Sequence, residues 1–83
     1  MAKRIVWTDQ ARADVRAIDR ETALELLRGL ARFAATGEGN VKRLQAIEPP
    51  ELRLRLGDYR LRFYDHGDSI EILRVRKRGE AYR

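Results

Sequence analysis

Arginine alternates with apolar residues on both sides of a Gly-Asp pair in the stretch LRLRLGDYRLRFY, residues 52–64. Gly57 and Asp58 are residue types that favour a two-residue hairpin loop. Because side chains alternate across a strand, such a hairpin places four arginines on one face: Arg53, Arg55, Arg60 and Arg62. Like charges that lie directly opposite each other destabilise a sheet. The cluster therefore makes most physical sense if a polyanion neutralises it, and the planar guanidinium fork suits phosphate.

Further basic residues follow this stretch and extend the cationic cluster. The last predicted strand and the segment after it contribute Arg74, Arg76, Lys77 and Arg78. The net charge of +5 also favours an acidic partner, and a nucleic-acid backbone is the commonest polyanion of this kind. The alternative is a solvated face on which the arginine stems merely cover apolar surface.

Aromatic residues are interleaved with this charge. Tyr64 has the same parity as Arg62, so its ring is expected on the basic face, where it can stack an unpaired base. A half-buried strand tyrosine without a ligand is the other interpretation. Tyr82 follows Arg78 near the end of the sequence, where a terminal residue without a role is the alternative. The residues predicted to contact RNA are Arg62, Tyr64, Arg74 and Arg76.

Two helices are predicted in the first half of the chain, after a short strand at residues 3–7. Thr8 and Asp9 can start the first helix, whose apolar stripe is Ala11, Val15 and Ile18. Asp19 can cap the second helix, and Gly37 is its expected end. The apolar residues with helical spacing in this second helix are Ala23, Leu24, Leu27, Leu30 and Phe33.

Strands are predicted in the second half. VKRL at residues 41–44 forms a short extended segment, and Pro49 and Pro50 interrupt regular structure. The two arms of the hairpin follow, and then a strand at residues 69–76. Strict alternation in this last strand places Ile70, Ile72 and Arg74 on one face and Leu73 and Val75 on the other, as in a central, doubly covered strand.

These elements predict one α+β domain over residues 1–83, with the order β-α-α-β-β-β and a helical hairpin packed on a small, mainly antiparallel sheet. The chain contains no cysteine, which excludes disulfides and thiolate metal sites and fits a cytosolic protein. Neither a signal peptide nor a membrane span is expected. The only histidine, His66, lies in a predicted surface turn, so neither a metal nor another cofactor is expected.

The sequence resembles the RelE/ParE superfamily of bacterial toxins from type II toxin–antitoxin pairs. The element order, the VKRL segment, the arginine hairpin and the ending ILRVRKRGEAY carry the resemblance, which is strongest over residues 41–82. The combination of G-D-Y-R-L-x-x-Y with a closing K-R-x-E-x-Y is distinctive of the superfamily, and the closing K-R-x-E-x-Y favours the RelE side. The resemblance implies the RelE-like microbial RNase fold. It also implies a ribosome-dependent endoribonuclease that cuts messenger RNA without a metal, through attack of a ribose 2′-OH on the neighbouring phosphate.

The resemblance also assigns roles. Arg53 and Arg55 match the paired basic residues before the turn, Arg60 matches the arginine after it, and Arg78 and Tyr82 match the closing motif. Arginine is a poor general base. Because neighbouring cations disfavour the protonated form of a lysine, Lys77 is predicted to contribute as the base, with Tyr82 stacking or assisting proton transfer.

The resemblance implies three partners in the cytoplasm and none in a membrane: an acidic cognate antitoxin that joins the toxin in a hetero-oligomer, the ribosome, and messenger RNA. Two other functions stay open. The ParE branch poisons DNA gyrase and is not a nuclease. A basic module that binds RNA or its antitoxin without catalysis is the second, since family members often have lysine or histidine where this chain has arginine.

Overall fold

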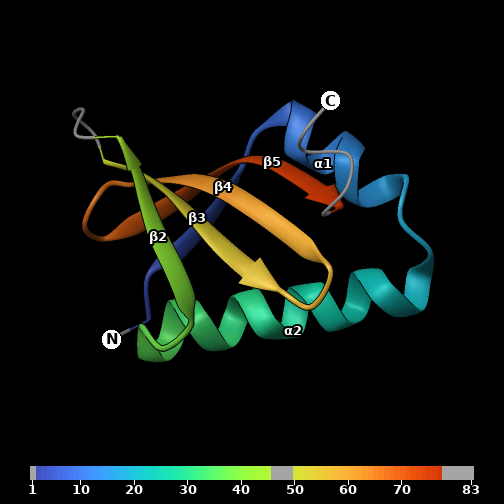
Figure 1. The fold of residues 1–83 in the computed structure, drawn as a ribbon, viewed down its shortest axis with the longest axis horizontal. Coiled ribbons are helices and arrows are strands. Elements are labelled where there is room, and N and C mark those ends of the chain that lie inside the picture. The colour runs from blue at the N-terminus through green and yellow to red at the C-terminus, as the bar shows by residue number, and fades with distance from the viewer. Residues whose placement is uncertain (1, 46–49, 78–83) are drawn as a thin grey trace.

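The computed structural model describes residues 2–45 and 50–77. Within them the chain forms, in order, β1 (Arg4–Trp7), α1 (Asp9–Arg16), α2 (Arg20–Thr36), β2 (Asn40–Gln45), β3 (Glu51–Leu56), β4 (Tyr59–Asp65) and β5 (Ser69–Lys77), as Figure 1 shows. This is the predicted α+β class. The VKRL segment is part of a full strand, β2, so the sheet has one strand more than the predicted order contains.

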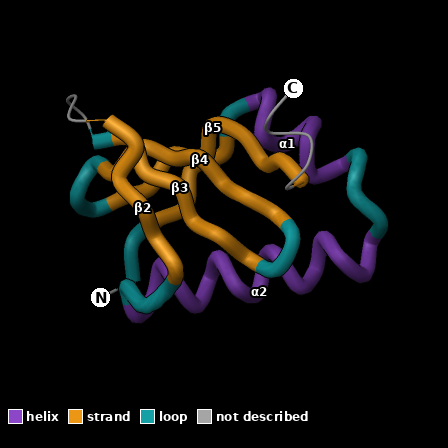
Figure 2. Tube along the Cα trace, in the orientation of Figure 1, coloured by secondary structure: helices purple, strands orange, loops and turns teal. Residues whose placement is uncertain are grey.

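The strands form one mixed sheet in the order β1-β5-β4-β3-β2. β1 pairs with β5 in parallel, and the remaining neighbours are antiparallel. The chain reverses between α1 and α2, and α2 runs along the strand layer (Figure 2). No helix in the described ranges is both long and apolar enough to span a membrane.

Both helices begin where the sequence predicts and α2 also ends there, but α1 ends at Arg16, before Ile18 of its predicted stripe. The Thr8 hydroxyl accepts a hydrogen bond from the Ala11 N–H at 3.1 Å and caps α1. The Asp19 carboxylate caps α2 by accepting from the Thr22 N–H at 3.0 Å, which holds the pKa of Asp19 below its usual value. Gly37 ends α2 with a φ of +76°, a left-handed conformation that glycine adopts without steric cost.

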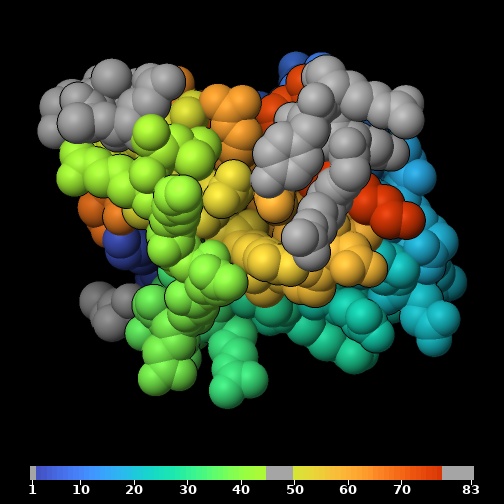
Figure 3. Space-filling model, in the orientation of Figure 1, coloured from blue at the N-terminus to red at the C-terminus, as the bar shows by residue number. Residues whose placement is uncertain are grey.

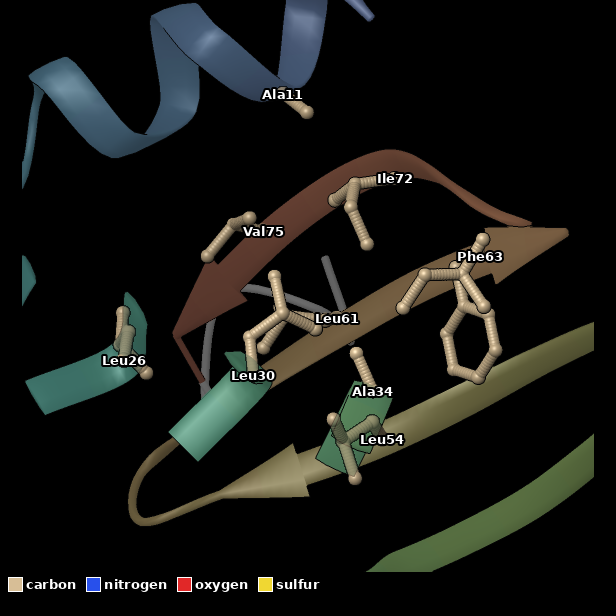
Figure 4. Close-up of a cluster of buried hydrophobic side chains, with 10 residues drawn as sticks. Ala11, Leu26, Leu30, Ala34, Leu54, Leu61, Phe63, Ile72 and Val75 are labelled. Atoms are coloured by element: carbon tan, nitrogen blue, oxygen red, sulfur yellow. The ribbon is translucent and has the colours of Figure 1, made fainter. Parts of the chain in front are cut away.

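One hydrophobic core joins the two helices to the same face of the sheet (Figure 4). The helices contribute Ala11, Leu26, Leu30 and Ala34, and the sheet contributes Leu54, Leu61, Phe63, Ile70, Ile72 and Val75. The predicted stripe of α2 was partly wrong, because Leu24 is 43% exposed and Leu27 is 38% exposed, whereas Leu26 is buried. The residues of α2 that are buried in the core are four positions apart, namely Leu26, Leu30 and Ala34.

The arginine hairpin has the predicted register. Leu56 lies opposite Tyr59, Arg55 opposite Arg60, and Arg53 opposite Arg62. Gly57 has a φ of +59°, and no residue other than glycine has a positive φ among those described. This matches a tight turn with glycine in its first central position, whose twist fits the flanking strands.

A β-bulge in β5 changes which residues share a face. Arg62 lies opposite Arg74, but Phe63 lies opposite Ile72, so Leu73 is the extra residue of the bulge. Ile72 and Val75 therefore both face the core, and Arg74 faces the other side. The prediction that Arg74 shares a face with Ile72 was wrong, because strict alternation cannot anticipate the inserted residue.

Candidate nucleic-acid interface

Two rows of basic residues cross the sheet on the face opposite the helices. Residues that lie directly opposite each other on neighbouring strands project to the same side, about 5 Å apart. The first basic row is Arg55, Arg60 and Arg76, and the second basic row is Lys42, Arg53, Arg62 and Arg74. Together they form the basic face. In the space-filling view, side chains of β2, β3 and β4 lie at the surface (Figure 3).

Two arginines of the second basic row are ion-paired. Arg62 Nη2 lies 2.9 Å from both carboxylate oxygens of Glu51, whose side chain is only 9% exposed. Arg74 Nε donates to Asp14 Oδ2 at 2.9 Å. The RNA contacts predicted for Arg62 and Arg74 therefore fall on side chains that already hold internal carboxylates.

Asp14 binds more than the guanidinium. Its Oδ2 atom also accepts from the Val75 backbone N–H at 2.9 Å, on the edge of β5 that extends beyond β1. Partial burial raises the pKa of this carboxyl. Hydrogen bonds from the Val75 N–H, the Arg74 side chain and Gln10 lower it by more, so the pKa lies below its usual value. The carboxylate thus joins α1 to a part of the β5 edge that no other strand of the described residues pairs with.

Three other arginines of the basic face carry no such carboxylate. Arg55 and Arg76 are exposed and Arg53 is half-buried, and none of them forms an ion pair with any acidic side chain in the described part of the chain. They come from three positions on β3 and β5, on either side of β4. Their charges are available to an anion on the basic face.

The remaining predicted site residues do not all lie on the basic face. Lys77 lies opposite Tyr59, whose side chain packs against the core, so the register directs Lys77 to the helix side of the sheet and away from the basic face. Arg78 and Tyr82 lie outside the described residues. Tyr64 is half-buried on the same side as Arg62, as the alternation predicts.

The sequence analysis did not identify Glu51 and Asp14, the two carboxylates that bind arginines of the basic face. Glu51 lies two residues before Arg53 on the same strand, so the alternation of side chains could have placed it on this face. Asp14 has no comparable signal, because it lies 60 residues from Arg74. Among the described residues, no group of three or more histidine and acidic side chains is arranged to hold a metal ion.

The model of the family described as the ParE toxin of type II toxin–antitoxin systems, parDE, matches residues 5–82. The chain belongs to this family. It is therefore a type II toxin of the RelE/ParE superfamily, as the sequence resemblance indicates. A search of curated proteins gives no match.

Solved structures with the same fold include two RelE–RelB complexes and one RelBE2 complex. The archaeal RelE–RelB complex from Pyrococcus horikoshii OT3 is 21% identical, with a TM-score of 0.76 over 95% of this toxin and 98% of that chain. The RelBE2 complex from Mycobacterium tuberculosis is 22% identical, with a TM-score of 0.78 over 94% and 93%. The RelB–RelE complex from Methanococcus jannaschii is 17% identical, with a TM-score of 0.66 over 93% and 94%.

The ion pairs predict that the arginines of the toxin's basic face differ in their contribution to stability. Arg62→Gln is expected to lower the free energy of unfolding by about 1–3 kcal/mol, because it leaves the nearly buried Glu51 carboxylate without its cation. The matched variant Arg55→Gln removes the same charge from an exposed side chain and is expected to change stability by less than about 0.5 kcal/mol. Urea unfolding of both variants measures the difference, and equal losses would contradict it.

Proposed function

We propose that this toxin is a ribosome-dependent endoribonuclease that cuts messenger RNA at its basic face. The observation that supports this most directly is the convergence of Arg53, Arg55 and Arg76 on one side of the sheet, without carboxylate partners among the described residues. Same-face positions lie about 7 Å apart along a strand and about 10 Å apart across two strand spacings, so these like charges repel each other, and a phosphodiester bound among them reduces that repulsion. Such a site also stabilises the additional negative charge of a phosphoryl-transfer transition state.

The reaction needs no metal in this proposal. The ribose 2′-OH attacks the adjacent phosphorus and the bond to the 5′ oxygen of the next nucleotide breaks, which leaves a cyclic phosphate and a free 5′-OH. The arginines position the phosphate and stabilise its charge. They do not accept the 2′-OH proton, because guanidinium stays protonated. The 2′-OH proton passes to water and the departing 5′ oxygen takes a proton from water, with Tyr82 of the closing motif assisting, since Lys77 lies on the helix side.

The proposal includes an acidic antitoxin as the physiological partner. The structures with the same fold were solved as toxin–antitoxin complexes with RelB. A type II toxin with a net charge of +5 and an exposed basic face presents a surface that acidic side chains neutralise. An antitoxin that covers Arg53, Arg55 and Arg76 would exclude the RNA from the same charges and thereby silence the toxin.

Poisoning of DNA gyrase is the second candidate function. It is favoured by the family description, which names the ParE toxin of parDE. In this alternative the basic face binds the enzyme or its DNA, and no RNA is cut.

One experiment separates the two functions. The purified toxin is incubated with ribosomes that translate a defined message, and primer extension maps the ends; in parallel it is incubated with gyrase and supercoiled plasmid. The expected result is cuts confined to the translated codons, absent without ribosomes, and an intact plasmid. An uncut message with broken plasmid would replace the nuclease by the gyrase poison, and two intact nucleic acids would leave a non-catalytic binder.

A further inference from the structure

Beyond the second basic row, towards the turn between β4 and β5, the same face of the sheet changes chemistry. Tyr64 on β4 lies directly opposite Glu51 on β3 and Glu71 on β5, so all three side chains project to the side of Arg62. Arg62 already holds Glu51. This end of the face therefore carries an aromatic ring between two carboxylates instead of a run of cations.

His66 adds a second ring and fixes one carboxylate. Its Nε2 atom lies 2.9 Å from Glu71 Oε1. Its ring meets the Tyr64 ring edge to face, with 6.2 Å between the ring centroids and an angle of 67° between the planes. The His66 side chain is 38% exposed and the Glu71 side chain is 34% exposed, so an incoming molecule can reach them. We call Tyr64, His66 and Glu71 the tyrosine–histidine–glutamate cluster.

The turn that carries His66 is held by several hydrogen bonds. The His66 N–H donates to the Ser69 carbonyl oxygen at 2.9 Å. The Asp65 carboxylate accepts from the Gly67 N–H at 2.9 Å and from Lys3 Nζ at 3.0 Å on each oxygen. These bonds tie the turn to the segment before β1, which positions the cluster before any ligand arrives.

The basic rows and the tyrosine–histidine–glutamate cluster differ in charge, so they suit different parts of a nucleic acid. A carboxylate repels phosphate, so the cluster is a poor site for the backbone that the basic rows attract. It offers instead what single-stranded RNA recognition uses, namely aromatic rings for stacking and a hydrogen-bonding group for the base edge. Glu71 Oε2 forms no hydrogen bond within residues 2–45 and 50–77 and is available as an acceptor.

We infer that the tyrosine–histidine–glutamate cluster is a base-recognition subsite for RNA that the basic face holds by its phosphates, an inference that rests on the proposed nuclease function. The base stacks on the Tyr64 ring, the His66 ring, inclined at 67° to that of Tyr64, contacts the base edge to face, and the exocyclic amine of the base donates to Glu71 Oε2. Cytosine, adenine and guanine carry such an amine and uracil does not. Tyr64 lies two residues along β4 from Arg62, or about 7 Å, so the base belongs to a nucleotide adjoining those bound by the second basic row.

Binding of short single-stranded RNA to the purified full-length toxin tests this inference without ribosomes and without cleavage. Fluorescence anisotropy at fixed low salt compares an oligouridine with an oligocytidine of equal length. The wild type is expected to bind the oligocytidine about tenfold more tightly, and Glu71→Ala to reduce this ratio to about one. Tyr64→Leu, which keeps an apolar side chain at this half-buried position, is expected to weaken both oligonucleotides about tenfold through the loss of stacking.

Asp68→Ala is the matched control. It removes one carboxylate from the same turn, but this side chain is 82% exposed and contacts only Arg4, at 3.8 Å, among the described ion pairs. It is expected to strengthen both oligonucleotides alike and leave their ratio unchanged. Equal binding of both oligonucleotides by the wild type, or the same change of ratio in Asp68→Ala as in Glu71→Ala, would overturn the subsite. A message left uncut in the ribosome assay would instead overturn the nuclease function, and the binding ratio would still report on the cluster.

Discussion

Replacing Arg53 and Arg55 together by glutamine is expected to slow cleavage of ribosome-bound messenger RNA about 100- to 1000-fold. Both side chains lie on β3 on the basic face, and neither is held by a carboxylate of the described chain. Their charge is therefore free to stabilise the phosphate in the transition state, where a preorganised donor contributes most. The rate of appearance of the cut ends, measured by primer extension at saturating ribosome concentration, gives the size of the effect.

A double variant on α1 is the control for net charge. Arg12→Gln with Arg16→Gln removes two positive charges from exposed side chains that border a pocket with Leu27 in the helix layer. This variant is expected to retain cleavage within about threefold of the wild type, because these side chains lie beside Leu27 in the helix layer and not on the basic face, and salt screens exposed charges. If both double variants slowed cleavage equally, the basic face would act only through overall charge and would not bind the reacting phosphate.

The features that could be predicted from the sequence are those set by neighbouring residues. The register of the arginine hairpin follows from the Gly57-Asp58 turn and from strict alternation on both sides of it. The helix caps at Thr8 and Asp19 are equally local, because each oxygen binds an N–H three residues later. These local rules were enough to place Arg53 and Arg55 on one face.

The features that could not be predicted depend on contacts between distant segments. The extra residue in β5, Leu73, reverses the alternation midway along the strand, and no residue type marks it. The apolar run of α2 permits more than one buried stripe, and the sheet decides in favour of Leu26. The carboxylate that binds Arg74 lies 60 residues away, on α1. Parity alone therefore overestimates how many of these arginines are available to a ligand.

Asp14→Asn is expected to lower the free energy of unfolding by about 2–3 kcal/mol at neutral pH. The Asp14 side chain is only 12% exposed and accepts from both Arg74 Nε and the Val75 N–H. The neutral amide can still accept from the Val75 N–H, but it leaves Arg74 without its anion. The loss of the Arg74 ion pair weakens the link between α1 and the edge of β5 beyond β1, so the end of β5 that carries Arg76 also loses support.

The pH dependence of stability tests whether the ionised Asp14 carboxylate causes the loss of stability in Asp14→Asn. Because the pKa of Asp14 in the folded protein lies below its usual value of 3.8, ionised Asp14 stabilises the fold. This contribution is fully present above about pH 5 and is lost as the pH falls through the folded-state pKa. The difference in the free energy of unfolding between wild type and Asp14→Asn should therefore narrow only in acid, as urea unfolding at pH 7 and at successively lower pH would measure. Asp68→Asn, which changes an 82% exposed carboxylate, should show no comparable gap at pH 7. A gap for Asp14→Asn that stayed constant into acid would mean that side-chain shape, and not the ionised carboxylate, holds α1 against β5.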